Sequence, residues 1–181
     1  MQPPSLHTMP SDADLVRGIR GADPVALTAV YRSHGTELLA LATRLTGSTA
    51  DAEDVLHDLI VGLPEAMRSY DERGKLRGWL KQVVVRMCLM RLRTERRRRE
   101  IALDDAGELS APAAAPSDVT DAIDLAVRDL SPAIRAVIVL RLVEGFTHLE
   151  IAQSLGISSN ASEARLSRGI AALRKRLETL I

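Results

Sequence analysis

Apolar residues recur at spacings of three and four along most of the chain, which is the period of an amphipathic helix. Within residues 14–46 this pattern includes Tyr31, His34, Leu38, Leu41 and Leu45. Pro24 is expected in the first turn of the longer part of this helix, where a missing backbone N–H costs nothing. The sequence shows neither the alternation of apolar and polar residues that would predict a strand nor an internal repeat. The pattern predicts an all-α fold.

Two further helices are expected before residue 100. The first follows Gly47, with Ser48 or Thr49 as its N-cap. Its apolar stripe comprises Ala52, Val55, Leu56, Leu59, Ile60 and Leu63. Residues 68–79 contain two glycines and a dense mixture of charges, which predicts a loop leading into the next helix. The expected buried face of that helix comprises Leu76, Trp79, Leu80, Val83, Val84 and Met87.

A change of composition divides the chain into two small helical domains. Residues 101–117 are small, acidic and proline-bearing, as is typical of a flexible linker. We therefore expect a disordered head at residues 1–13, a first domain at 14–100 and a second domain at 118–181. In the second domain, helices are expected over 119–130 and 133–143, with Ser131 and Pro132 as cap and first position of the latter and Gly145 ending it.

The segment from Thr147 to Arg176 has the pattern of a helix-turn-helix. Thr147 and Glu150 can form a capping box, Gly156 can make the turn, and Ser158 can cap the second helix. Ala152 is small enough for the helices to cross closely. The second helix is expected to bury Leu166, Ile170, Leu173 and Leu177 and to expose Arg165, Arg168, Arg174, Lys175 and Arg176. Such a helix can enter a major groove, although an ordinary helical hairpin with a solvated basic face is the alternative.

Charge is segregated along the chain although 24 basic and 24 acidic residues cancel. From Lys75 to Arg99 ten residues are basic and only Glu95 is acidic. Together with Trp79 this suggests a DNA-facing helix, in which arginines bind phosphates and loop side chains hold an unstacked base. Simple solvated charge is the alternative. Two DNA-binding units on one linker would form a bipartite site.

Composition also restricts the possible functions. Aromatic residues are few, at 2% of the chain, so aliphatic side chains must fill the core. Cys88 is the single cysteine, which excludes an intrachain disulfide, and the four histidines lack metal-ligand spacing. No glycine-rich phosphate loop is present. We therefore expect no enzyme, no metal and no cofactor. The chain has no signal-peptide pattern and no run of 18 apolar residues, so we expect a cytoplasmic protein without membrane insertion.

From about residue 14 to the end, the chain resembles a bacterial sigma factor of the extracytoplasmic function (ECF) type, with only the second and fourth sigma domains. Four segments carry the resemblance in order and spacing, namely residues 51–63, 70–80, 91–99 and 130–177. The resemblance implies a promoter-specificity subunit that binds core RNA polymerase and double-stranded promoter DNA with its opened strand. It also implies sequestration by an anti-sigma factor, which could hold the protein at a membrane.

The resemblance also assigns roles to particular residues. An acidic helix surface is implied to bind core polymerase, through Asp51, Glu53, Asp54 and Asp58. The loop and helix that follow are implied to bind the minus-ten element, through Arg77, Trp79, Lys81, Arg86, Arg91 and Arg93. The helix-turn-helix is implied to read the minus-thirty-five element, through Ser158, Ser159, Asn160, Glu163, Arg165, Ser167 and Arg168.

Three segments depart from the family pattern, and they keep other functions open. Residues 59–67 replace an aromatic and arginine-rich stretch, and residues 84–86 replace the frequent Ala-Arg-Asn. In the recognition helix, Ser162 takes a position that is usually apolar and buried, and Glu163 replaces a cation. Glu163 could accept a hydrogen bond from a cytosine amino group but would repel phosphate. The alternatives are a sigma-like decoy that binds polymerase or an anti-sigma protein without opening promoters, and a conventional helix-turn-helix repressor or activator whose N-terminal domain dimerises.

Overall fold

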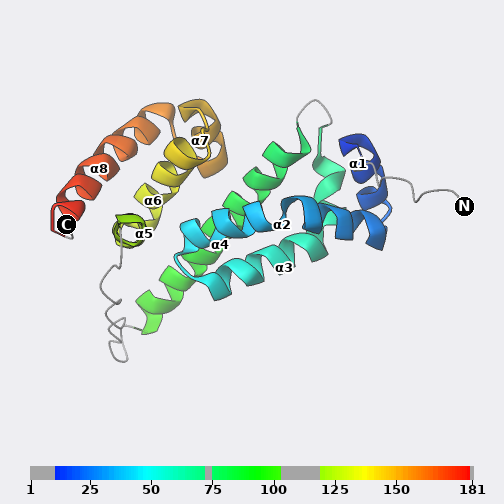
Figure 1. Cartoon of the computed structure of the whole chain (residues 1–181), viewed down its shortest axis with the longest axis horizontal. Coiled ribbons are helices and arrows are strands. Elements are labelled where there is room, and N and C mark those ends of the chain that lie inside the picture. The colour runs from blue at the N-terminus through cyan, green and yellow to red at the C-terminus, as the bar shows by residue number, and fades with distance from the viewer. Residues whose placement is uncertain (1–10, 72–74, 103–118, 180–181) are drawn as a thin grey trace, which may run out of the picture.

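The computed structural model describes residues 11–71, 75–102 and 119–179, and this part of the chain is helical without strands (Figure 1). The first domain contains α1 (Asp12–Arg20), α2 (Pro24–Thr46), α3 (Thr49–Ala66), the 3-10 turn η1 (Met67–Ser69) and α4 (Leu76–Ala102). The second domain contains α5 (Val119–Arg128), α6 (Pro132–Ile138), the π-helical turn η2 (Val139–Val143), α7 (His148–Leu155) and α8 (Ser159–Leu177). The all-α prediction is confirmed.

The first domain is built around the pairing of α2 with α3. Gly47 adopts φ 78° and ends α2, and Ser48 then caps α3 by accepting a hydrogen bond from the Asp51 N–H. A left-handed residue is cheap only for glycine, so this turn fixes where the chain reverses. The apolar stripe of α3 packs inward as expected, except that Ile60 is only half-buried. The helix α4 crosses both helices and completes the core (Figure 1).

Two boundaries in the first domain differ from the sequence-based expectation. The helix expected over 14–46 is broken at residues 21–23, where Ala22 has a positive φ of 54°, and α1 begins at Asp12. Pro24 does open α2, as predicted. The expected loop 68–79 is shorter, because η1 occupies its start and α4 already begins at Leu76. The apolar pattern of α4 therefore prevailed over the second glycine, Gly78, which lies in the first turn of the helix.

In the second domain the predicted caps of α7 and α8 are confirmed, whereas Ser131 precedes α6 without a capping hydrogen bond from its side chain. Pro132 occupies the first turn of α6, and Thr147 and Glu150 form the capping box of α7. Gly156 adopts φ 64° at the turn, and Ser158 caps α8 by accepting from the Ala161 N–H. The sequence therefore specified the helix-turn-helix locally, because each cap satisfies a backbone donor or acceptor within a few residues.

The buried face of α8 was predicted incorrectly. The four expected core residues, Leu166, Ile170, Leu173 and Leu177, are only half-buried. The fully packed positions are instead small, Ser162 and Gly169. A Cβ on Gly169 would lie 2.7 Å from Ile138 Cγ1 of α6, so the two helices approach too closely there for a side chain. Close helix crossing selects small residues, and a pattern search for large apolar ones cannot detect it.

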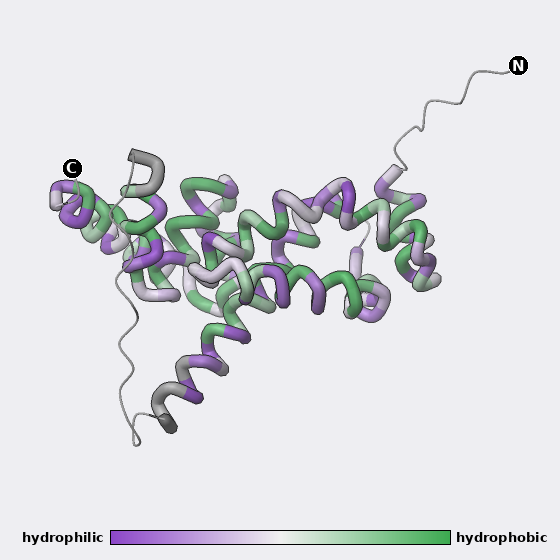
Figure 2. The backbone as a smooth tube through the Cα atoms, turned by 60° about the horizontal axis from the view of Figure 1, so that its bottom comes forward, coloured by the Kyte–Doolittle hydropathy of each residue, from purple (hydrophilic) through white to green (hydrophobic). Residues whose placement is uncertain are grey.

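The two domains contact each other. Helix α4 packs against α7, while α2 packs against α6. One hydrophobic cluster includes Leu80 and Val84 of the first domain together with Val137, Leu140 and Ile151 of the second. The C-terminal part of α4, before its last turn, projects away from the other helices (Figure 2). Most of the predicted linker 101–117, and most of the predicted head 1–13, lies outside the described residues.

Candidate polymerase and nucleic-acid interfaces

The acidic residues of α3 form a surface at the N-terminal half of that helix. Glu53, Asp54 and Asp58 are exposed, and Asp51 is half-buried. Negative charge is favourable beside the partial positive charge of a helix N-terminus. The four carboxylates expected to bind polymerase thus share one helix, although they do not share one environment.

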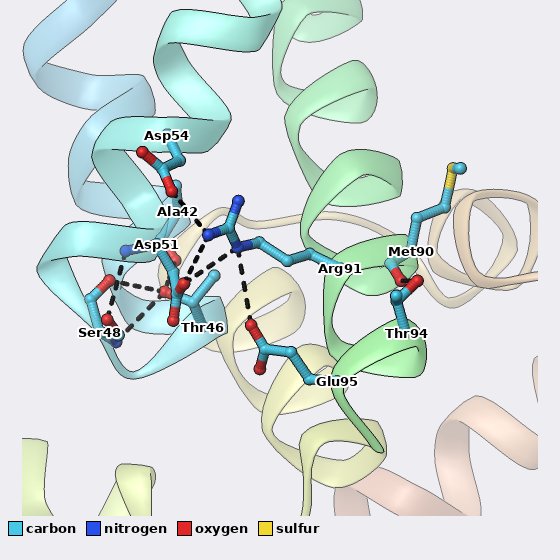
Figure 3. A network of polar contacts seen from close by, with 9 residues as sticks. All are labelled: Ala42, Thr46, Ser48, Asp51, Asp54, Met90, Arg91, Thr94 and Glu95. Carbon is cyan, nitrogen blue, oxygen red and sulfur yellow. Dashed lines mark hydrogen bonds and ion pairs between the residues drawn. The ribbon is translucent and has the colours of Figure 1, made fainter. Parts of the chain in front are cut away.

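Arg91 of α4 binds two of these carboxylates. Its Nε donates to Asp51 at 2.9 Å and its Nη2 donates to Asp54 at 2.6 Å (Figure 3). Glu95 lies one turn further along α4, 3.6 Å from Arg91 Nε. The hydrogen bond to Asp54 is the main cause of the raised pKa of Arg91, despite the opposing effect of desolvation. The guanidinium expected at promoter DNA therefore bridges the acidic helix to the basic helix.

Trp79 lies beside the loop that precedes α4. Its ring packs against Tyr70 with centroids 5.2 Å apart and planes at 60°. Helix α1 holds both flanks of the loop, because Arg20 donates to the Tyr70 carbonyl at 3.2 Å and the Leu76 N–H donates to Asp12 at 3.3 Å. Residues 72–74 of the loop lie outside the described part. Sequence patterns did not suggest that α1 supports this loop.

Two more of the expected DNA cations bind a single carboxylate of α2. Arg77 forms a bidentate pair with Glu37, at 2.8 Å from Nε and 2.5 Å from Nη2. Lys81 lies 2.6 Å from the same carboxylate and also pairs with Glu144 of the second domain. Hydrogen bonds from Arg77, opposed by burial and reinforced by Lys81, lower the pKa of Glu37 to about 2. In this arrangement the Lys81 ammonium is buried and faces carboxylates, so it is not available to DNA.

The other predicted minus-ten cations remain accessible. Arg86 and Arg93 are exposed on α4. Neither forms an ion pair with another residue in the part of the chain that is described. They are therefore the better placed of the six to meet phosphate in this conformation.

The helix α8 presents polar side chains from its first turns. Exposed side chains there are those of Ser158, Asn160, Glu163, Ser167 and Arg168, while those of Ser159 and Arg165 are half-buried. Arg168 folds back onto its own helix, where Nε donates to the Ala164 carbonyl at 3.2 Å. Five of the seven residues predicted to read DNA are thus exposed, and Glu163 is the single anion among the seven.

One polar contact inside the helix-turn-helix was not predicted. Ser162 is fully buried, and its Oγ lies 2.9 Å from His148 Nδ1 of α7. The expectation that Ser162 takes a buried position is confirmed, but the partner could not be identified from spacing. A hydrogen bond satisfies a hydroxyl that would otherwise be costly to bury.

Across 11–71, 75–102 and 119–179 no group of histidine, cysteine and carboxylate side chains is arranged to hold a metal ion. Within the same residues, no helix is long and apolar enough to cross a membrane. Cys88 is buried, and desolvation raises the pKa of its thiol to about 12.

Two family models and several known proteins match this chain. The family model for sigma-70 region 2 matches residues 30–98, and the model for sigma-70 region 4 matches residues 120–173. The ECF RNA polymerase sigma factor SigL of Mycobacterium tuberculosis is 31% identical over 173 residues, covering 91% of this chain and 96% of SigL. SigM of the same organism is 27% identical over 167 residues, covering 92% of this chain and 85% of SigM.

Two solved structures share the fold. The sigma factor RpoE of Bartonella quintana, solved in complex with the anti-sigma factor NepR, gives a TM-score of 0.64 at 23% identity, covering 79% of this chain and 91% of that one. CnrH, solved with the cytosolic domain of CnrY, gives a TM-score of 0.62 at 23% identity, covering 93% of this chain and 97% of CnrH.

Fold and matched regions define the class as a two-domain transcription initiation factor of the sigma-70 type. The chain belongs to the ECF RNA polymerase sigma factors. Its partners are core RNA polymerase and promoter DNA.

Proposed function

We propose that this sigma factor binds core polymerase through the acidic surface of α3, composed of Asp51, Glu53, Asp54 and Asp58. The observation that carries the proposal is the position of these carboxylates on one helix, three of them exposed, inside the segment matched as region 2. A basic partner surface would gain from several carboxylates at once, as complementary interfaces do. Arg91 already neutralises part of this charge, so Asp58 and Glu53 offer the freer carboxylates.

Promoter recognition is divided between the two domains. The loop beside Trp79, with Arg86 and Arg93, binds the minus-ten element, and Arg77, Lys81 and Arg91 join only where their ion pairs open. The exposed side of α8, with Asn160, Glu163 and Arg168 at its centre, reads the minus-thirty-five element in the major groove. Strand opening uses this binding energy, and the protein itself carries out no enzymatic step.

An anti-sigma factor is proposed to control the protein. The support is similarity to sigma factors that were solved with NepR and with the cytosolic domain of CnrY. The sigma factor itself would be cytoplasmic, and a membrane location would come only from such a partner.

Two measurements test the proposal. Charge reversal of Asp58 to Lys is expected to weaken binding to purified core polymerase at least about tenfold, whereas Asp124→Lys, an equal change on the exposed face of α5, is expected to have little effect. Unchanged affinity of Asp58→Lys would remove the polymerase role of α3. Run-off transcription with core polymerase, on DNA upstream of the protein's own operon, tests the function. Core binding without a promoter-dependent transcript would favour the decoy.

A further inference from the structure

Lys81 lies at the centre of a charge cluster that joins the two domains. Its ammonium lies between Glu37 of α2 and Glu144, which follows η2 in the second domain. The Lys81 side chain is 11% exposed and the Glu144 side chain 6%. Burial opposes the charge on Lys81, yet the hydrogen bonds with Glu144 and Glu37 outweigh it and raise the pKa of Lys81. Water is largely excluded from this contact.

Glu144 is held rigidly in position. Its N–H donates to the Val139 carbonyl at 3.1 Å, and the Phe146 N–H donates to the Leu140 carbonyl at 2.9 Å, so the backbone around it is fixed. If the domains separate, Lys81 keeps Glu37 as a partner, because both belong to the first domain, and Glu144 meets water. The Lys81–Glu144 pair therefore depends on the relative position of the domains.

A second contact between the domains, made by Arg135, favours their separation. Arg135 of α6 is 6% exposed and points at the end of α2, where Nη1 lies 3.5 Å from the Thr46 carbonyl. Its Nε has no hydrogen-bond partner in the described structure, and a Cβ on Gly47 would lie 2.5 Å from its Nη1. Desolvation, with repulsion from Arg128, lowers the pKa of Arg135. A buried cation without a carboxylate is costly, so this contact favours separation.

The closed arrangement also restricts the two DNA-binding surfaces. Arg93 of α4 and Arg165 of α8 line the same cleft between the domains, together with Leu92, Pro132 and Ile157. The cleft has a volume of about 430 Å³, which is that of a small-ligand site and not of a double helix. Duplex DNA cannot enter this cleft, so the sides of Arg93 and Arg165 that line it are closed to DNA, although Arg93 also has an exposed side.

We propose that the salt bridge from Lys81 to Glu144 is a latch that, with the apolar contacts across the same interface, holds the two domains closed in the free sigma factor and must break before promoter DNA binds. The latch needs no other protein. Arg135 keeps the closed state from becoming irreversible, because its guanidinium is hydrated again when the domains part. Closure of the domains is independent of the proposed function. The effect of closure on DNA binding rests on the proposed function.

Small-angle X-ray scattering of the full chain tests closure without DNA. Glu144→Ala is expected to raise the radius of gyration, while Glu178→Ala, the same charge change on an exposed side chain at the end of α8, leaves it unchanged. Arg135→Met removes the buried cation and is expected to keep the domains as close as, or closer than, in the unmodified protein. Circular dichroism reports whether each variant stays helical.

Each outcome decides the proposal. An unmodified protein that is already extended in solution, or a folded Glu144→Ala with an unchanged radius, overturns the latch. If Glu144→Ala does not fold, a larger radius of gyration of Arg135→Met overturns the latch, and an unchanged or smaller radius supports it. With core polymerase present, Glu144→Ala is expected to bind a duplex from upstream of its own operon up to about tenfold more tightly, the factor for a state open in about one molecule in ten. If Glu144→Ala has a larger radius of gyration but does not bind the duplex more tightly, the latch has no role in DNA binding. If neither the unmodified protein nor any variant binds the duplex, the proposed function is contradicted instead.

Discussion

Gly169 of α8 lies directly against Ile138 of α6, at a distance that leaves no room for a Cβ. A methyl group there would lie 2.7 Å from Ile138 Cγ1 and 2.8 Å from Ile134 Cγ2. Ile138 is itself 3% exposed and cannot move into solvent. The close packing of the recognition helix α8 against α6 therefore depends on the absence of a side chain at Gly169.

Gly169→Ala is expected to destabilise the protein by about 1–3 kcal/mol, because overpacking outweighs the better helix propensity of alanine. The matched control is Gly62→Ala in α3, where no atom lies within 4 Å of the added Cβ. That variant is expected to be stabilised by about 0.5–1 kcal/mol. Urea unfolding measures both. Equal and stabilising effects of the two substitutions would show that α8 and α6 lie further apart in solution than in this structure.

Arg91→Ala is expected to lower stability by about 0.5–1 kcal/mol, because Asp51 and Asp54 lose the cation between them. Arg93→Ala is the matched control, since Arg93 is exposed on the same helix. It is expected to leave stability unchanged and to reduce the salt dependence of DNA binding by about one counterion. Thermal unfolding and DNA titrations at several salt concentrations separate the two effects. If Arg91→Ala loses DNA affinity while its thermal stability is unchanged, Arg91 contacts DNA directly.

Ser162→Ala is expected to cost about 0.5–1.5 kcal/mol through loss of its hydrogen bond to His148. His148 is half-buried and can find water, so the penalty stays at the lower end of this range. Urea unfolding of Ser162→Ala, His148→Ala and the double variant measures the coupling. Strictly additive effects would mean that the two side chains do not interact in solution.

The lowered pKa of Glu37 predicts a pH dependence of stability. Its pKa is about 2 in the folded protein, against an ordinary value of 4.5, mainly because Arg77 donates hydrogen bonds to it. The charged form is thus favoured by folding, so the stabilisation is complete above about pH 5 and is lost as the pH falls from 4.5 toward 2.

The unfolding free energy of the unmodified protein and of Glu37→Gln is therefore expected to converge as the pH falls through this range. Chemical unfolding at a series of pH values measures the difference. The exposed Glu178→Gln serves as the control for charge alone. A difference that stays constant down to pH 2 would mean that Glu37 is not ion-paired.

By itself, the sequence determined the local structure of this protein and its family. Caps at Ser48, Thr147 and Ser158, the left-handed glycines and the apolar periods act over a few residues, so they can be identified along the chain. The same holds for the acidic and basic helices, because residues at helical spacing share a face wherever the helix lies.

Only the tertiary structure decided what each charged or small residue contacts. Arg77, Lys81 and Arg91 pair with carboxylates between 37 and 63 positions away in the chain, and Gly169 meets α6. Coulomb interactions and steric exclusion depend on distance in space and on burial, and neither can be read from spacing along one helix. For that reason, the cationic residues of α4 that looked equivalent in sequence divide into a bridge to the acidic helix, a contact between domains, and free side chains that can meet DNA.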